Sequence, residues 1–261
     1  MMKKFNLLVF SIALVPLMSA CQDKQHSIIA INTMGNEQSF IEVDLNQTKN
    51  LIDANQPFVL EVYSTYCEAC KELEPHLKSY ADGSKKAVYR LNIGEITQTD
   101  FDSTLRNVYP DIFIREYTPT IYFIKDKALT YEVNPNKYSS TTALKSIMNK
   151  HFLSSEVTLI NNLASFKTYT QKNDNYIVFS YDLNNINSLS LAAEQLINAK
   201  LKTNILLLNY QYMLGDFGSI QAKYEAIDIH FASAVKDGSK IKTINYLDDD
   251  GSSLKDLIST F

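Results

Sequence analysis

The chain is poor in the residues that make reactive, rigid or metal-binding sites. Its 261 residues include three cysteines, six prolines and seven glycines, and no tryptophan. No cysteine follows Cys70 and no proline follows Pro135. Dithiol chemistry is therefore excluded from the second half. A zinc site normally needs four ligands, and the sequence has neither a second CxxC nor a paired histidine spacing, so we expect no metal.

An excess of basic charge is also missing. The chain carries 25 basic and 29 acidic residues, a formal net charge of −4, and its lysines and arginines are scattered. Removing residues 1–20 takes away two lysines and lowers the net charge to −6. Proteins that bind nucleic acid usually gather basic residues on one face. We therefore expect no nucleic-acid partner.

The N-terminus has the pattern of an export signal. Lys3 and Lys4 precede an apolar run at residues 5–17, too short to span a bilayer comfortably, and the segment closes on Met18-Ser19-Ala20-Cys21. This ending resembles a bacterial lipoprotein processing site, although Met18 stands where that family usually has leucine. The resemblance implies that Cys21 is lipidated; the alternative is an ordinary signal peptide cleaved near Cys21.

No second long apolar stretch follows this signal. The resemblance therefore implies an exported protein, lipid-anchored on the extracytoplasmic face of a bacterial cell membrane, with a soluble body. Residues 22–37 are polar and are interpreted as an irregular stalk after the anchor.

The remaining chain predicts an α/β fold in two similar halves. In the first half we expect strands at residues 39–45, 58–63, 88–93, 120–124 and 129–133, with helices at 47–54, 67–83, 101–108 and 142–152. In the second half we expect strands at 157–160, 176–181, 205–209, 229–234 and 242–246, with helices at 162–170, 189–200, 220–226 and 254–260. Both halves have the order β-α-β-α-β-α-β-β-α. We predict two tandem domains, 38–152 and 157–261; the alternative is one α/β domain with an unrelated extension.

Cys67 and Cys70 form the most informative motif. An apolar run at residues 58–63 ends just before them, and Cys70 starts an apolar helical face that continues at Leu73 and Leu77. Two thiols three positions apart at the start of a helix can join reversibly in one disulfide. We therefore predict a redox centre; the alternative is a static structural disulfide.

Four further positions stand at fixed spacings from this pair. Glu61 lies six residues before Cys67, Tyr66 directly before it, Pro75 five residues after Cys70, and Thr118-Pro119-Thr120 precedes a later strand. With these positions, residues 38–152 resemble the thioredoxin superfamily. The resemblance implies a thioredoxin-like fold for this half and, by the matching order of elements, for the second half, which lacks the CxxC.

Helix position predicts how the two cysteines divide the reaction. Unpaired N–H groups at a helix N-terminus favour a thiolate, so Cys67 is expected to attack a substrate and form a mixed disulfide. Cys70, on the buried face, then resolves that intermediate. No cofactor other than the redox-active disulfide is expected.

The resemblance also assigns roles to three other sites. Glu61 is expected to exchange a proton with Cys70, since a carboxylate inside an apolar strand is costly unless it is used or paired; the alternative is a solvent-facing strand residue. Pro119 is expected to follow a cis bond beside the dithiol; the alternative is a trans proline that opens a strand. Tyr66 and the backbone of Thr118 are the expected substrate contacts.

The sequence between the cysteines bears on the direction of transfer. The negative charge of Glu68 opposes ionisation of Cys67 and so favours a reductant, while Lys71 partly offsets it. We expect an enzyme, a thiol–disulfide oxidoreductase acting on exported protein thiols and disulfides with an unidentified redox partner protein. An oxidant or isomerase stays open, as does an envelope binding or assembly factor that uses the fold as a scaffold.

The second half carries no exchangeable dithiol. After its strand at residues 176–181 the sequence continues Asp182-Leu183-Asn184-Asn185, where the cysteines are expected to fall. We interpret this half as a non-catalytic module that positions a partner or substrate; the alternative is a spacer or a stabilising partner for the first half.

Overall fold

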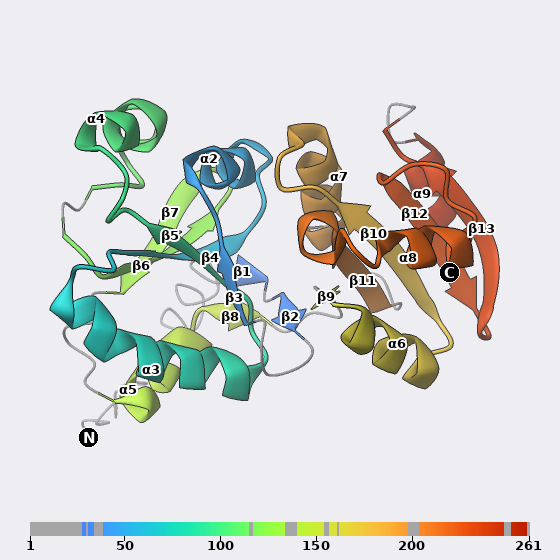
Figure 1. The fold of residues 1–261 in the computed structure, drawn as a ribbon, viewed down its shortest axis with the longest axis horizontal. Coiled ribbons are helices and arrows are strands. Elements are labelled where there is room, and N and C mark those ends of the chain that lie inside the picture. The colour runs from blue at the N-terminus through green and yellow to red at the C-terminus, as the bar shows by residue number, and fades with distance from the viewer. Residues whose placement is uncertain are drawn as a thin grey trace, which may run out of the picture.

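The computed structural model describes residues 28–29, 31–33, 39–114, 117–133, 140–153, 157–160, 162–197, 204–247 and 252–259, and Figure 1 shows two α/β units side by side. The predicted export signal and Cys21 lie outside the described residues. No helix among the described residues is both long enough and apolar enough to cross a membrane.

The first unit follows the predicted order. Its elements are β3 (Phe40–Glu42), α2 (Leu45–Asp53), β4 (Phe58–Tyr63), α3 (Glu68–Ser84), β5 (Val88–Asn92), α4 (Gln98–Phe101), the π-helix η1 (Asp102–Arg106), β6 (Thr120–Lys125), β7 (Ala128–Val133) and α5 (Thr141–Asn149). The sheet order is β3-β5-β4-β6-β7, with β3, β5 and β4 parallel and β6 and β7 antiparallel.

The second unit repeats this plan. Its elements are β9 (Val157–Ile160), α6 (Leu163–Lys172), β10 (Tyr176–Tyr181), α7 (Ile186–Ile197), β11 (Asn204–Asn209), the 3-10 helix η3 (Tyr210–Met213), α8 (Phe217–Tyr224), β12 (Phe231–Lys236), β13 (Ser239–Asn245) and α9 (Ser252–Ile258). Strands β9, β11 and β10 are parallel, β12 and β13 are antiparallel, and they follow the order of the first sheet. The structure thus has two tandem thioredoxin-like units.

Local sequence explains the elements that carry the site. The side chains of β4 and β10 are buried almost throughout, which suits central strands covered on both faces. Helix α3 contains Pro75 and continues through Gly83 to Ser84, where Lys85 closes it in the left-handed conformation at φ 55°. A tight turn at Asp126-Lys127 joins β6 and β7, with φ of 54° and 57°.

The prediction of an irregular stalk over residues 22–37 is wrong at two places. Strand β1 (Ile28–Ile29) pairs in parallel with β8 (Phe152–Leu153), whose first residue was predicted to end a helix, and β2 (Asn32–Thr33) pairs in parallel with β9. The N–H of Ala87 also donates to the Ile31 carbonyl, at 2.9 Å. These strands depend on partners more than a hundred residues away, which no local pattern in the sequence records.

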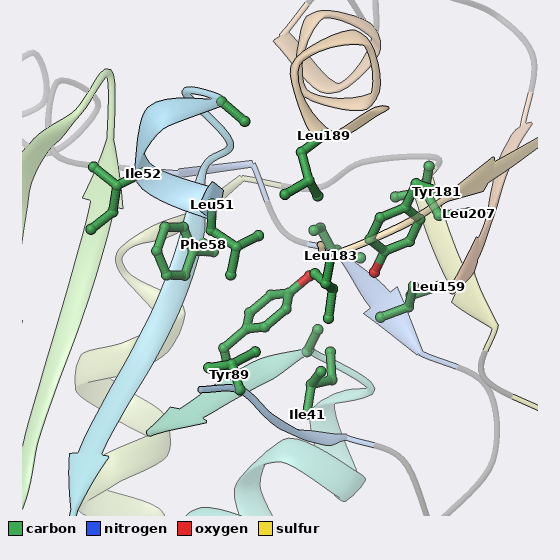
Figure 2. Packing of buried hydrophobic residues seen from close by; sticks show 14 of the residues in the cluster. Ile41, Leu51, Ile52, Phe58, Tyr89, Leu159, Tyr181, Leu183, Leu189 and Leu207 are labelled. Carbon is green, nitrogen blue, oxygen red and sulfur yellow. The ribbon is translucent and has the colours of Figure 1, made fainter. Parts of the chain in front are cut away.

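One hydrophobic core runs through both units. Figure 2 shows residues of the first unit and residues of the second in a single cluster, labelled as Ile41, Leu51, Ile52, Phe58, Tyr89, Leu159, Tyr181, Leu183, Leu189 and Leu207. Hydrogen bonds surround this contact: Asn50 Nδ2 donates to the Leu183 carbonyl at 3.1 Å, and the Tyr212 hydroxyl donates to the Glu42 carbonyl at 3.0 Å. A shared apolar core favours one rigid body over two independent domains.

Candidate functional site

The two cysteines lie at the start of α3, directly after the loop that leaves β4. Cys67 is the N-cap residue, and its Sγ accepts the backbone N–H of Cys70 at 3.1 Å. Both cysteines are free thiols, with Cys67 partly exposed and Cys70 buried. The structure therefore brings the predicted pair together at a helix N-terminus, in the reduced form.

The environment separates the two thiols chemically. Burial acts to raise the pKa of Cys67, but its hydrogen bonding with Cys70, Thr118 and Ala69 outweighs burial, so the net pKa is lowered. Burial raises the pKa of Cys70 to about 11. Because the thiolate is the nucleophile in disulfide exchange, Cys67 is the thiol suited to attack at neutral pH.

The loop before β6 closes the other side of the dithiol. The Thr118–Pro119 peptide bond is cis, as predicted, and the Thr118 carbonyl oxygen lies 3.6 Å from Cys67 Sγ. Pro119 is buried, whereas the Tyr66 side chain beside Cys67 is 73% exposed. Tyr66 is therefore exposed directly before Cys67 in the chain, and the Thr118 carbonyl lies close to Cys67 Sγ.

Glu61 is fully buried in β4, which rules out the solvent-facing alternative. Its Oε2 accepts the Nε–H of Arg90 in the adjacent strand β5, at 2.6 Å. Burial raises the pKa of Glu61 to about 7, with Arg90 acting in the opposite direction. The second oxygen, Oε1, is buried with no hydrogen-bond partner among the described residues, so this carboxyl can take up a proton near neutral pH.

Arg90 was missed by sequence reasoning. Its Nη1 also lies 3.2 Å from Glu42 and 3.4 Å from Glu74, and its guanidinium stacks on the Tyr63 ring at 4.0 Å. The residue is only 4% exposed. A charged side chain inside the apolar strand β5 is the same signal that pointed to Glu61 in β4, and it could have found this partner.

A small cavity of about 60 Å³ lies beside the cis-proline loop, on the face of β4 that α3 does not cover. Its lining residues are Val62, Ile93, Ile96, Gln98, Phe101, Arg106, Tyr117 and Tyr122. Within the described part of the chain, no three histidine, cysteine, aspartate or glutamate side chains gather in a group that could hold a metal ion.

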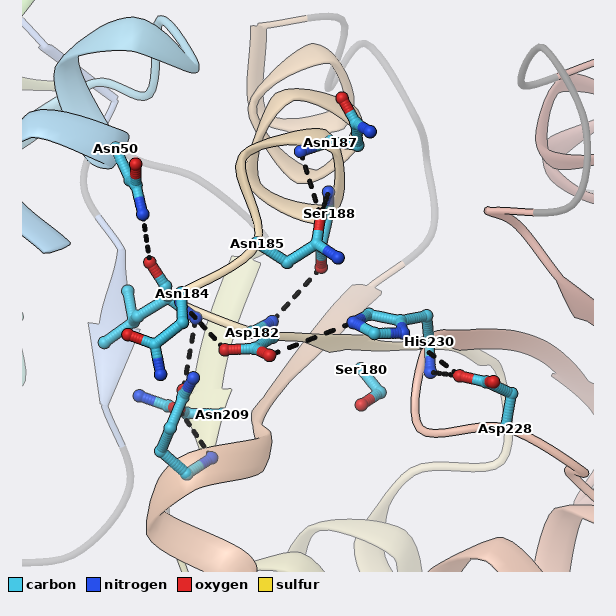
Figure 3. Close-up of polar contacts among 12 residues, drawn as sticks. Asn50, Ser180, Asp182, Asn184, Asn185, Asn187, Ser188, Asn209, Asp228 and His230 are labelled. Atoms are coloured by element: carbon cyan, nitrogen blue, oxygen red, sulfur yellow. Dashed lines mark hydrogen bonds and ion pairs between the residues drawn. The ribbon is translucent and has the colours of Figure 1, made fainter. Parts of the chain in front are cut away.

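The second unit has a counterpart of the dithiol loop, shown in Figure 3. Asn185 follows the end of β10 by four residues, as Cys67 follows β4, and its Oδ1 accepts the N–H of Ser188 at 3.1 Å. Asn185 and Ser188 thus occupy the places of the two cysteines, slightly later than residues 182–185, where the sequence suggested them. His230 directly precedes β12, as Pro119 precedes β6.

Polar contacts occupy this counterpart. The Nδ1 of His230 lies 3.0 Å from Asp228 Oδ1, and its Nε2 lies 4.0 Å from Asp182 Oδ2. The Ser188 hydroxyl pairs with the Tyr246 hydroxyl at 2.7 Å and is fully buried. The arrangement holds the loop in place and has no group capable of disulfide exchange.

Comparison with known proteins identifies the family that the first unit resembles. Residues 38–150 match the family model described as Thioredoxin. Similar solved structures include thioredoxin O2 from Arabidopsis thaliana in the oxidized state, at 18% identity, TM-score 0.32, and coverage of 43% of this chain and 94% of that chain. The human ERp44 zinc-bound form has 13% identity, TM-score 0.32, and coverage of 84% and 59%.

A J-Trx1 fragment of ERdj5 has 16% identity and TM-score 0.34, over 43% of this chain and 50% of that fragment. The chain therefore spans about half of that fragment's length. At these scores the family match and the sheet topology carry more weight than any single structural neighbour.

Proposed function

Because residues 38–150 form a thioredoxin-family domain with a CxxC pair, we propose that the protein is a thiol–disulfide oxidoreductase. The observation that carries the proposal is the difference between the two thiols. Cys67 has a lowered pKa at an accessible helix N-terminus, whereas Cys70, one turn into the helix, is buried with its pKa raised to about 11. A static structural disulfide needs no such division.

The reaction proceeds by two exchanges. The Cys67 thiolate attacks one sulfur of a substrate disulfide, forming a mixed disulfide and releasing the other substrate sulfur as a thiolate. The Cys70 thiol then loses its proton and attacks Cys67 Sγ. This step forms the Cys67–Cys70 disulfide and releases the second substrate sulfur, so the substrate gains two electrons and the protein loses two.

In this proposal Glu61 is the proton acceptor for Cys70. A thiol with a raised pKa needs a base, and burial brings the pKa of Glu61 to about 7, close to neutral pH. Tyr66 and the Thr118 backbone contact the substrate chain, in keeping with their positions beside Cys67.

We propose a reductant as the physiological direction. Glu68 follows Cys67 directly, and its negative charge opposes a thiolate there, which makes the couple less oxidising. Glu68 is 82% exposed and pairs with Lys71 at 2.7 Å, so this effect is small. The lowered pKa of Cys67 acts in the opposite direction, because a stabilised thiolate makes a couple more oxidising. The reduction potential decides between the two.

The location and the partners are also proposals. The N-terminal signal pattern and Cys21 support an exported protein, lipid-anchored on the extracytoplasmic face of a bacterial membrane. Its substrates are then exported proteins with thiols or disulfides, and a separate redox protein restores its dithiol.

We propose that the second unit stabilises the first. Its counterpart of the dithiol loop includes Leu183, which is fully buried in the shared core, and the Leu183 carbonyl accepts a hydrogen bond from Asn50 of α2. A loop covered in this way cannot present the same surface to a partner. This burial favours the stabilising role over the partner-positioning role.

The decisive measurement is the reduction potential of the Cys67–Cys70 couple, by equilibration with glutathione at known poise. A value near −270 mV, typical of reducing thioredoxins, supports a reductant, and one near −120 mV reverses the direction. Cys70→Ser should trap substrates as mixed disulfides, and Cys67→Ser should trap none. If Cys67→Ser keeps full activity in cells, the protein is a binding or assembly factor instead.

A further inference from the structure

The loop that carries Cys67 rests on a short segment after β5. The backbone N–H of Ile93 donates to the Tyr63 carbonyl at 2.8 Å, which brings Gly94 against Ser64 and Thr65. A Cβ built on Gly94 would lie 2.9 Å from Ser64 Oγ and 3.0 Å from Thr65 Oγ1. Carbon and oxygen atoms that are not bonded rarely approach this closely, so a side chain here would displace these two hydroxyl groups.

The atoms that would move are the ones that hold the loop. Ser64 Oγ accepts the N–H of Tyr66 at 3.2 Å, and the Ser64 carbonyl accepts the N–H of Cys67 at 3.1 Å. Asn92 Oδ1 accepts the N–H of Gly94 at 2.9 Å and that of Thr65 at 3.4 Å. Hydrogen bonds therefore join the two segments at Tyr63 and Thr65, and contacts within the loop continue from Ser64 to the backbone N–H groups of Tyr66 and Cys67.

We propose that Gly94 is a positioning residue, whose missing side chain lets Ser64 hold the Tyr66–Cys67 backbone in place for attack. The inference rests on the proposed role of Cys67 as the attacking thiol. Gly94 is required here for space, since its backbone does not adopt a positive φ. A methyl group would displace Ser64 Oγ and move Cys67 Sγ relative to the Cys70 N–H that stabilises its thiolate.

The test measures the thiolate of Cys67 directly. In a Cys21→Ser, Cys70→Ser background Cys67 is the single thiol, and its alkylation by iodoacetamide is followed as a function of pH. Gly94→Ala should move the inflection to higher pH and slow alkylation at pH 7 by about three- to tenfold. Gly83→Ala is the matched control, because Gly83 lies near the end of α3 and a Cβ there meets nothing within 4 Å. The alkylation profile of this variant should be unchanged.

A double-mutant cycle identifies the contact through which Gly94 acts. If Gly94 acts through Ser64 Oγ, the double variant Ser64→Ala, Gly94→Ala should shift the alkylation profile no further than Ser64→Ala alone. Additive effects, an unchanged profile in Gly94→Ala, or an equal shift in Gly83→Ala would each overturn the proposal.

The test still decides if Gly94→Ala fails to fold or if Cys67 takes part in no physiological exchange. If Gly94→Ala does not fold, Ser64→Ala alone removes the contact of Ser64 Oγ with the Tyr66 N–H without adding bulk, and it should move the alkylation profile to higher pH; an unchanged profile there overturns the proposal. Alkylation needs no protein substrate, so the shift is expected even if Cys67 takes part in no physiological exchange. A protein that reduces disulfides but shows no shift refutes the role of Gly94 alone.

Discussion

The two units carry the same loop with opposite exposures. In the first unit the loop after β4 presents Tyr66, 73% exposed, beside a reactive thiol. In the second unit the loop after β10 buries Leu183 completely against the first unit. The same backbone plan thus carries the CxxC pair, with Cys67 partly exposed, in one unit and a docking surface, buried against the first unit, in the other.

The two loops share a backbone arrangement, although only the first carries cysteines. Cys67 and Asn185 both cap a helix, each accepting the N–H three residues later at 3.1 Å. The fourth residue of the preceding strand is the proton-binding Glu61 in β4 but the apolar Phe179 in β10. A few side chains therefore separate the proposed redox site from a structural loop, because the helix cap and the sheet need neither sulfur nor acid.

The largest expected effect comes from giving the first loop the residues of the second. Cys67→Asn with Cys70→Ser should reduce disulfide exchange by about a thousandfold or more, because no nucleophile remains. Reduction of a disulfide-bonded protein measures the loss. Thermal unfolding provides the control: asparagine keeps the helix cap, whereas Cys67→Ala with Cys70→Ser should lose about 1 kcal/mol. Equal losses of stability would show that the caps are not equivalent.

The reverse exchange should restore much less. Asn185→Cys with Ser188→Cys, in a Cys67→Ser, Cys70→Ser background, should form a disulfide but give at most about 1% of native turnover. The missing base alone costs about 100-fold or more, and the loop is covered. Free-thiol titration checks the disulfide, and the same protein reduction checks turnover. Turnover near the native value would mean that burial of this loop does not limit exchange.

Opening the docking surface should cost stability. Leu183→Asp buries an unpaired carboxylate in the shared core and should lower the free energy of unfolding by about 3 kcal/mol or more, measured by urea denaturation. Leu214→Asp is the control, because Leu214 is 61% exposed and its replacement should cost less than about 0.5 kcal/mol. Similar costs for both would argue against a shared core.

Glu61 should give the active loop a pH dependence that the second unit lacks. Its pKa is raised to about 7 by burial, so Cys70-dependent resolution should speed up as pH rises through 7, and Glu61→Gln should remove that inflection with a rate loss of about tenfold or more. Glu74→Gln, at a half-exposed position, is the matched control and should keep the inflection.

The same carboxyl also affects stability. The folded-state pKa lies above the ordinary value of 4.5, so the protonated form is favoured on folding. The stabilisation that protonated Glu61 gives to the folded state is complete below pH 4.5 and is lost as pH rises through 7. Glu61→Gln should flatten this decline in urea denaturation, and an unchanged slope would place the titrating group elsewhere.

The smallest effect is expected at the polar edge of the docking surface. Asn50→Ala removes the hydrogen bond to the Leu183 carbonyl and should cost about 1 kcal/mol in urea denaturation. Gln47→Ala removes the exposed hydrogen bond to Asn184 and the capping-box bond from the Asp44 N–H, both exposed, and should cost less than Asn50→Ala, about 0.5 kcal/mol. A reversed order would show that α2 contacts the loop differently in solution.

Sequence reasoning recovered the order of elements and the central strands, since continuous apolar runs mark β4, β9 and β10 at their observed bounds. It also found the dithiol, Glu61 and the cis-proline, because their chemistry depends on residue type and spacing. Contacts between distant segments were the part it could not give. The pairing of β2 with β9 and the ion pair of Arg90 with Glu61 depend on the register of the folded sheets.

Strands β1 and β2 have a mechanical consequence. The chain at Ile28 enters the molecule at the junction of the two units, pairing first with β8 and then with β9 (Figure 1). A force applied to the chain before Ile28 therefore acts along the short parallel strand pairs β1–β8 and β2–β9. Both units bear this force, since β9 belongs to the second unit. Under the proposed N-terminal anchoring, the molecule is held where its two units meet, so the first unit alone sets the distance from that point to Cys67.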